Sequence, residues 1–139
     1  MNFDHFFPAS ENRQVTAGLV GAGQFGASLI NQATLMPRFK VPFLCDLDIE
    51  LAKKAFLDAG IAEEDIFFAD SAPAALRAFE MGKKIITDDY RLLCALPADI
   101  IVEATGQPEA AASIAYLALT SGYHVAMVTK EADIVVGPY

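Results

Sequence analysis

Residues 15–32 read VTAGLVGAGQFGASLINQ and place three glycines between an apolar run and an amphipathic one. The run Val15–Val20 consists mostly of apolar and small residues, which predicts a short buried strand. From Gln24 to Met36 the apolar residues recur at helical spacing, and Pro37 predicts the end of this helix. The apolar face of the predicted helix carries Phe25, Leu29, Ala33 and Met36.

The three glycines, Gly21, Gly23 and Gly26, form the pattern GxGxxG between this strand and this helix. That context is the one in which the pattern indicates a dinucleotide site. Gly21 allows a sharp bend, Gly23 lets a pyrophosphate approach the backbone, and Gly26 lets the helix lie close to the strand. The unpaired N–H groups and the positive dipole end of the helix would hold the phosphates. The structural alternative is a tight turn that binds no ligand.

Asp46 follows the next predicted strand, VPFLCD, about 20 residues after the last glycine of the pattern. An acid at this place accepts hydrogen bonds from the ribose of NAD and repels the 2′-phosphate of NADP. NAD is therefore favoured as the cofactor, although Lys53 and Lys54 could reach a phosphate, so NADP stays open. A helix-flanking acid is the structural alternative for Asp46. A methyltransferase loop would have GxGxG, which Phe25 breaks.

Apolar runs typical of strands alternate with helical patterns along the rest of the chain. Further strands are predicted at IFFAD, at Ile85–Thr87, at DIIVEATG and at HVAMVT, and further helices begin near Asp48, Ser71 and Pro108 and end at Gly60, Gly82 and Gly122. Such alternation predicts a parallel sheet built from βαβ units. We therefore expect a single-domain α/β fold of the Rossmann type, a doubly wound parallel sheet over residues 15–139, preceded by an N-terminal arm, residues 1–14.

Composition narrows the classes of partner. The chain of 139 residues has a formal net charge of −8 and only 10 Lys and Arg, which are dispersed, so nucleic acid is not expected as a partner. No run reaches the roughly 18 uncharged apolar residues that a membrane span needs. The N-terminal sequence MNFDHFFPASENRQ lacks the features of a signal peptide, which favours a cytoplasmic protein.

The residue types that bind metals or form disulfides are sparse. Cys45 and Cys94 lie in apolar surroundings without a CxxC motif, which predicts two reduced core thiols. Asp88 and Asp89 have no further ligands nearby and are predicted to cap the following turn. We therefore expect no metal site.

Two further segments follow strands at the edge where a doubly wound sheet binds its ligand. In EATGQPE, Thr105 and Gly106 would place a hydroxyl and backbone near the nicotinamide half of the cofactor. In the predicted loop TKEAD, Lys130 and Glu131 stand where reactive groups would meet a substrate, and a surface ion pair is the alternative. His124 begins a strand and is expected to be half-buried rather than catalytic.

The segments GLVGAGQFG, CDLD, ITDD, IIVEATGQPE and GYHVAMVTKEADIVVGP, in this order, resemble the amino-terminal NAD(P)-binding domain of homoserine dehydrogenase-like proteins. The branch most similar is the one with a carboxyl-terminal SAF domain, which includes deoxyxylulose phosphate reductoisomerase-like enzymes. The resemblance implies a nucleotide loop at Gly21, Ala22, Gly23, Gln24, Phe25 and Gly26, a ribose acid at Asp46, and a nicotinamide-side turn at Ala104, Thr105 and Gly106.

Homoserine dehydrogenases carry a Thr-Ala-Asn-Lys stretch that aligns with residues 127–130, where only Lys130 matches. The resemblance therefore does not extend to homoserine as the substrate. Lys130 becomes the candidate for a substrate contact or a proton transfer.

The resemblance implies the NAD(P)-binding domain of an oxidoreductase that transfers hydride to or from a hydroxyl or carbonyl carbon of a small-molecule substrate. Family members continue into a substrate and oligomerisation region. This chain is then expected to be the cofactor half of a longer, homo-oligomeric enzyme and to be inactive alone. The alternative is a stand-alone nucleotide-sensing or regulatory module.

Overall fold

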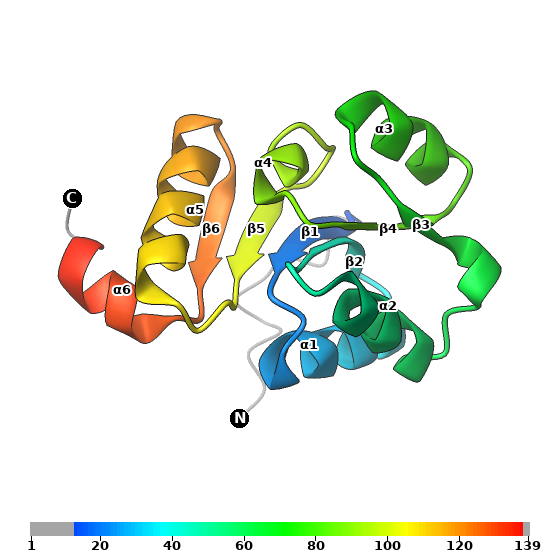
Figure 1. Cartoon of the computed structure of the whole chain (residues 1–139), viewed down its shortest axis with the longest axis horizontal. Coiled ribbons are helices and arrows are strands. Elements are labelled where there is room, and N and C mark those ends of the chain that lie inside the picture. Colours follow the sequence, from blue (N-terminus) through cyan, green and yellow to red (C-terminus); the bar gives the residue numbers. More distant parts are fainter. Residues whose placement is uncertain (1–12, 138–139) are drawn as a thin grey trace.

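The computed structural model describes residues 13–137 and contains one six-stranded sheet. Helices lie on both faces of this sheet (Figure 1). The strands are β1 (Val15–Val20), β2 (Phe39–Cys45), β3 (Ile66–Phe68), β4 (Lys84–Thr87), β5 (Ile100–Glu103) and β6 (His124–Met127). The helices are α1 (Gln24–Leu35), α2 (Ile49–Asp58), α3 (Ala72–Glu80), α4 (Tyr90–Leu93), α5 (Pro108–Thr120) and α6 (Lys130–Val136), with a 3-10 turn at Glu63–Asp65.

All strand pairings are parallel, and the strand order is β3-β4-β2-β1-β5-β6. From β1 the chain adds β2, then β3 at the edge and β4 between β2 and β3, and it then crosses to the other side of β1 to add β5 and β6. This arrangement confirms the predicted doubly wound α/β fold. Because every strand is parallel, all six carboxyl ends lie along one edge, and the order reverses between β1 and β5.

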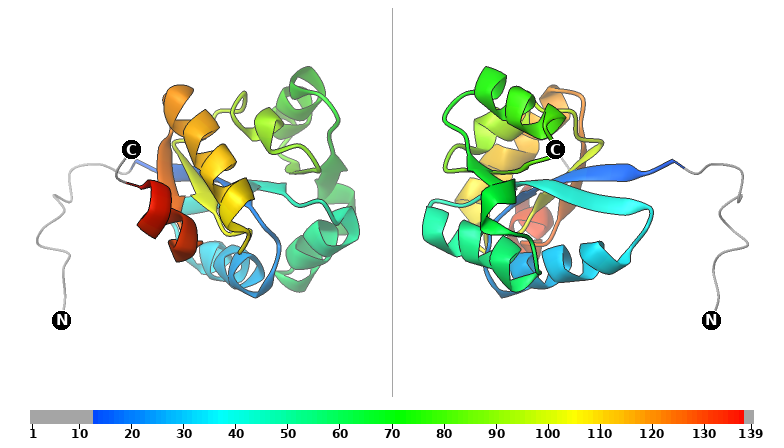
Figure 2. Two further views of the ribbon diagram at one scale, coloured as in Figure 1. Left: turned by 60° about the vertical axis from the view of Figure 1, so that its left-hand side comes forward. Right: turned by 90° about the vertical axis from the view of Figure 1, so that its right-hand side faces the viewer.

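Alternate residues of the central strands feed two separate cores. Phe43 and Ile85 belong to the core under α3, α4 and α5, whereas their neighbours Leu44 and Ile86 belong to the core under α1 and α2. Figure 2 shows helices on both sides of the sheet. Burial on both faces is why these strands read as continuous apolar runs and not as alternating ones. It also accounts for the high apolar content, 54% of the chain.

The predicted apolar face of α1 was right in the middle of the helix and wrong at its ends, because Ala33 is buried and Leu29 packs against the core. The buried residues are Gly26, Ile30 and Ala33, while Phe25 is 48% and Met36 is 43% exposed. At the start of the helix Gly26 faces inward in place of Phe25, because Gly26 lies directly against the carbonyl oxygen of Gly21, where a Cβ atom would overlap that oxygen. Contact between helix and turn thus sets which residue is buried at this end, against the preference of the larger side chains.

Capping residues and glycine stops in the sequence correctly predicted where several other helices begin and end. Asp48 caps α2 by accepting a hydrogen bond from Leu51 N, and Asp89 caps α4 by accepting one from Arg91 N. The helices α2, α3 and α5 each end two residues before a predicted glycine stop. The segment TKEAD, expected to be a loop, instead begins the helix α6.

Strand β2 contains an irregularity beside Pro42. Thr16 pairs with Lys40 but Gly18 pairs with Phe43, so β2 has one more residue than β1 over this interval. Proline lacks a backbone N–H, and a bulge is where a strand tolerates that loss. The bulge interrupts the regular alternation of β2, and the consecutive residues Lys40 and Val41 line the same pocket.

Both cysteines are free thiols, as predicted; Cys45 is buried and Cys94 half-buried. Burial, with a smaller contribution from Asp46, raises the pKa of the Cys45 thiol to about 12. Within residues 13–137 no helix is long and apolar enough to cross a membrane, and no cluster of His, Cys, Asp and Glu could hold a metal ion. Residues 1–12 of the predicted N-terminal arm lie outside the described part of the chain.

Candidate functional site at the carboxyl edge of the sheet

The turn after β1 is shaped by two glycines that no other residue could replace without displacing backbone. Gly21 has φ +106°, and a Cβ atom on it would overlap the carbonyl oxygen of Ala104 at the end of β5. Gly26, as described, abuts the carbonyl of Gly21. These contacts bring the start of α1 against both β1 and the turn after β5.

Gly23 differs from both, because a Cβ atom built on it would have no other atom within 4 Å. It is exposed and is the N-cap residue of α1, with no side chain accepting from the first turn. The first N–H groups of a helix have no partner within the helix. The backbone around Gly23 therefore presents uncapped donors, at the positive end of the α1 dipole, to an open space.

Asp46 follows β2, and its carboxylate is hydrogen-bonded to the turn of residues 21–23. Its Oδ2 accepts a hydrogen bond from Ala22 N at 2.7 Å, and its Oδ1 accepts one from Asp48 N at 2.9 Å. Each carboxylate oxygen can accept a second hydrogen bond, so Asp46 retains capacity for hydroxyl groups of a ligand. Sequence reasoning placed Asp46 at this edge but did not predict that it braces the turn.

Leu47, the next residue, is 90% exposed. An exposed leucine beside a half-buried aspartate gives this edge an apolar surface next to an acceptor. Gln24 and Phe25, at the start of α1, are exposed as well.

A buried carboxylate that sequence reasoning missed organises the second half of the edge. Glu103, the last residue of β5, is 0% exposed. It accepts hydrogen bonds from Thr105 N (2.7 Å), Thr105 Oγ1 (2.7 Å), Thr129 N (3.2 Å) and Thr129 Oγ1 (2.8 Å). Four neutral donors thus surround the carboxylate, which satisfies the requirement that a buried charge be hydrogen-bonded. The sequence offered one indication of this role, because Glu103 is the acidic residue at the end of the apolar run DIIVE.

The hydroxyl of Thr129 connects this carboxylate to the turn after β5. It donates to Glu103 and accepts a hydrogen bond from Gly106 N at 3.0 Å. The hydroxyl of Thr105 is also engaged, because it donates to Glu103 and accepts from Gln107 N at 3.1 Å. The Thr105 hydroxyl, which was expected to lie near the nicotinamide, is therefore turned inward. The N–H groups of Ala104, Thr105 and Gly106 also donate within the protein, to Val20, Glu103 and Thr129, so the turn has no free N–H group.

Lys130 is the first residue of α6 and is exposed. It follows Thr129 directly, so it lies at the carboxyl end of β6, beside the Glu103 network and two strands from the glycine turn. No ion pair joins Lys130 to Glu131 in residues 13–137. His124 is exposed and not half-buried, and it lies at the amino end of β6, away from this edge.

Comparison with known proteins agrees with this geometry. Residues 18–134 match the model of the family described as the NAD-binding domain of homoserine dehydrogenase. No curated protein matches the chain significantly in sequence.

Three solved structures are similar in fold. The first is myo-inositol dehydrogenase from Lactobacillus casei in complex with NAD(H) and myo-inositol, with a TM-score of 0.60 and 18% identity over 82% of this chain. The second is a dehydrogenase from Chromobacterium violaceum, with a TM-score of 0.58 and 20% identity over 83% of this chain. The third is the WlbA dehydrogenase from Bordetella pertussis in complex with NADH and UDP-GlcNAcA, with a TM-score of 0.57 and 20% identity over 83% of this chain. This chain spans 28% of the length of each. At such identities the likeness establishes a shared fold.

Proposed function

The chain belongs to the family of the homoserine dehydrogenase NAD-binding domain, and on that premise we propose that its carboxyl edge binds the cofactor of an oxidoreductase. The reaction is hydride transfer to or from a hydroxyl or carbonyl carbon of a small molecule. The nicotinamide, when bound, supplies the hydride acceptor or donor. The residues of this chain bind the cofactor and orient it.

The observation that carries the proposal is the open space at Gly23 beside the uncapped start of α1. Gly21 and Gly26 are required by packing alone, whereas nothing in residues 13–137 explains why position 23 has no side chain. A pyrophosphate provides the reason, because it must approach the backbone to reach the N–H groups of the helix. The cofactor-binding loop is then Gly21, Ala22, Gly23, Gln24, Phe25 and Gly26.

Asp46 is proposed to accept hydrogen bonds from the adenosine ribose. Its two oxygens lie beside the glycine turn, held by Ala22 N and Asp48 N. A 2′-phosphate would meet a carboxylate here, so we propose that NAD binds at least as well as NADP. Lys53 is paired with Glu63, and Lys54 with Asp58, which weakens the case that either lysine serves a 2′-phosphate. The exposed Leu47 offers an apolar contact for the adenine.

The nicotinamide half is proposed to lie along Ala104, Thr105 and Gly106. This turn is held to Glu103 and Thr129 through the hydrogen bonds given above, so its backbone is fixed before any ligand arrives. A backbone that is already fixed orients a reactive ring without the cost of ordering a loop. Lys130, adjacent to Thr129, is proposed to contact the substrate or move its proton.

Residues 15–139 are proposed to form one cofactor-binding domain whose substrate is a hydroxylated small molecule. The solved relatives were crystallised with myo-inositol and with UDP-GlcNAcA, both rich in hydroxyl groups, and this chain spans 28% of their length. The finer assignment, to the branch with a SAF domain, is also a proposal. Its support is the similarity of the segments VEATG and GYHV to that branch.

Calorimetric titration of the chain with NAD, before and after Gly23→Val, tests the proposed site. The added side chain enters open space, so the fold is retained while the pyrophosphate is displaced, and we expect affinity to fall by about tenfold or more. Asn31→Val, at an exposed position of the same helix, is the matched control and should leave affinity unchanged. Equal affinity for the wild type and Gly23→Val would refute the assignment.

A further inference from the structure

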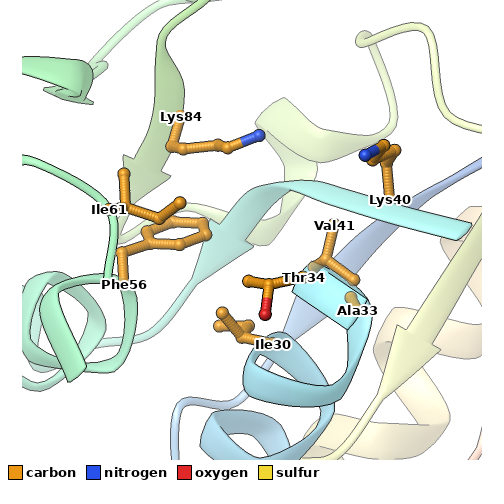
Figure 3. Close-up of a pocket in the computed structure, with 8 residues that line it drawn as sticks. All are labelled: Ile30, Ala33, Thr34, Lys40, Val41, Phe56, Ile61 and Lys84. Carbon is orange, nitrogen blue, oxygen red and sulfur yellow. The ribbon is translucent and has the colours of Figure 1, made fainter. Parts of the chain in front are cut away.

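A pocket lies at the edge of the sheet opposite the proposed cofactor site, between the amino ends of β2 and β4 and the helices α1 and α2 (Figure 3). Its volume is about 220 Å³. The wall is apolar and includes Ile30, Val41, Phe56 and Ile61, and two lysines, Lys40 and Lys84, complete the lining. None of these residues belongs to the proposed cofactor site, so the pocket is a separate feature of the molecule.

The two lysines lie close enough to affect each other. Burial lowers the pKa of the Lys84 ammonium, the positive charge of Lys40 lowers it further, and Asp65 opposes the shift. In residues 13–137 no carboxylate or carbonyl accepts a hydrogen bond from either ammonium group. Figure 3 shows both lysines along one side of the pocket, with the apolar side chains of α1 and α2 across from them.

This lack of an acceptor is unusual for the region. Lys53 bonds to Glu63, Lys54 to Asp58, and Lys83 to the carbonyl of Glu64. The chain is rich in acids, with 18 Asp and Glu against 10 Lys and Arg, yet in residues 13–137 no Asp or Glu forms an ion pair with Lys40 or with the half-buried Lys84. Two like charges beside a partly buried apolar wall repel each other, and an anion between them would relieve that repulsion.

The residues that line the pocket limit the size and chemistry of an anion that could bind there. Thr34 also lines the pocket, but its hydroxyl donates to the carbonyl of Asn31, so the two ammonium groups are the available donors. A volume of 220 Å³ corresponds to about seven water-sized groups. Inorganic phosphate would satisfy the lysines but leave the apolar wall uncovered, whereas a neutral apolar molecule would leave the lysines unpaired.

We propose that this pocket binds a small apolar carboxylate, with roughly six to eight carbon atoms, whose carboxylate is held by Lys40 and Lys84 and whose hydrocarbon part covers Phe56, Ile61 and Ile30. Charge-assisted hydrogen bonds to both ammonium groups fix the orientation of the ligand. Burial of its hydrocarbon part contributes in proportion to the apolar area removed from water. This site is independent of the proposed cofactor site and goes beyond that function.

Hexanoate is the probe, added to the complete 139-residue chain while backbone amide resonances are followed by NMR. We expect saturable shifts confined to the neighbourhood of Val41, Ile61 and Lys84. Hexan-1-ol, which lacks the charge, and phosphate, which lacks the hydrocarbon, should each bind at least about tenfold more weakly. Shifts that continue linearly with concentration, or equal binding of hexanol, would overturn the proposal.

Two charge-matched variants sharpen the test. Lys84→Met removes one ammonium group but keeps an unbranched side chain of similar length. It should lower the affinity for hexanoate by about tenfold without unfolding the protein. Lys54→Met removes the same charge from the exposed face of α2 and should have no effect. Unchanged affinity in Lys84→Met, or equal weakening in Lys54→Met, would overturn a specific site. NAD titration of each variant reports separately on the cofactor edge.

Discussion

The carboxylate of Asp46 accepts a hydrogen bond of 2.7 Å from the backbone N–H of Ala22, which lies 24 positions earlier in the chain. The residue proposed to recognise the ribose is therefore also a brace for the turn proposed to bind the pyrophosphate. This bond couples the position of the proposed ribose-binding residue to the conformation of the proposed pyrophosphate-binding turn. Changes at Asp46 should be visible in both cofactor choice and stability.

We predict that Asp46→Ala lowers the affinity for NAD by about tenfold and reduces or reverses the preference of the protein for NAD over NADP. It should also lower the free energy of unfolding by about 1–2 kcal/mol, because a partly buried N–H loses its acceptor. Competitive titration and urea denaturation measure the two effects. Asp46→Asn, which keeps one acceptor oxygen, should recover part of the stability. A wild-type protein that strongly prefers NADP would contradict the assignment.

Gly23 and Gly26 should differ in how well they tolerate substitution by alanine. Gly26→Ala places a Cβ atom against the backbone carbonyl of Gly21, which cannot move without displacing β1, and it should cost about 2 kcal/mol or more. Gly23→Ala, which meets no atom within 4 Å, should stay within about 0.5 kcal/mol of the wild type. Urea denaturation measures both. Similar losses for the two variants would show that position 23 is constrained by packing.

Glu103→Gln should be strongly destabilising. The amide offers one acceptor oxygen to four donors and directs its own N–H groups at the others, so at least one donor is left unsatisfied, at about 1–3 kcal/mol each. Thermal denaturation measures the loss, and hydrogen exchange at Gly106 should accelerate. Thr129→Ser keeps the hydroxyl and should be milder than Thr129→Val. Equal effects of these two would contradict a role for the hydroxyl.

Lys130 is predicted to be dispensable for cofactor binding. It lies at the end of β6, with β5 between it and β1, so Lys130→Ala should leave NAD affinity within about twofold of the wild type. The 139-residue chain should show no hydride transfer with homoserine or deoxyxylulose phosphate when nicotinamide absorbance is followed. Turnover by this chain would mean that these residues already form a complete substrate pocket.

Asp99 should make stability depend on acid pH. Hydrogen bonds from Thr16 N and from Arg13, each 2.8 Å, lower the pKa of this carboxyl below its ordinary value of 3.8. A lowered folded-state pKa means that the stabilisation is complete above about pH 4 and is lost as the pH falls through the folded-state value. Denaturation midpoints between pH 2 and about 6 should fall less steeply for Asp99→Asn. Identical pH profiles would contradict this link.

The sequence predicted the elements whose signals are local. The strand, turn and helix of residues 15–35, the caps at Asp48 and Asp89, and the alternation that implies a parallel sheet all follow from short-range patterns of burial and hydrogen bonding. The spacing of Gly23 and Asp46 likewise placed both at one edge, because consecutive parallel strands bring their carboxyl ends together. These features required no knowledge of distant contacts.

Tertiary contacts decided what local patterns could not. The inward-facing position of Gly26 at the start of α1 depends on its contact with Gly21, the position of β4 between β2 and β3 depends on which strand edges remain open, and the Glu103 network joins residues 26 positions apart. Lys40 and Lys84 likewise share a pocket only because β2 and β4 are neighbours in the sheet. Hydrophobic periodicity predicts whether a residue is buried, but it does not predict which distant residue will contact it. Partners are chosen when the whole chain packs, by steric fit and by the need to satisfy every buried polar group.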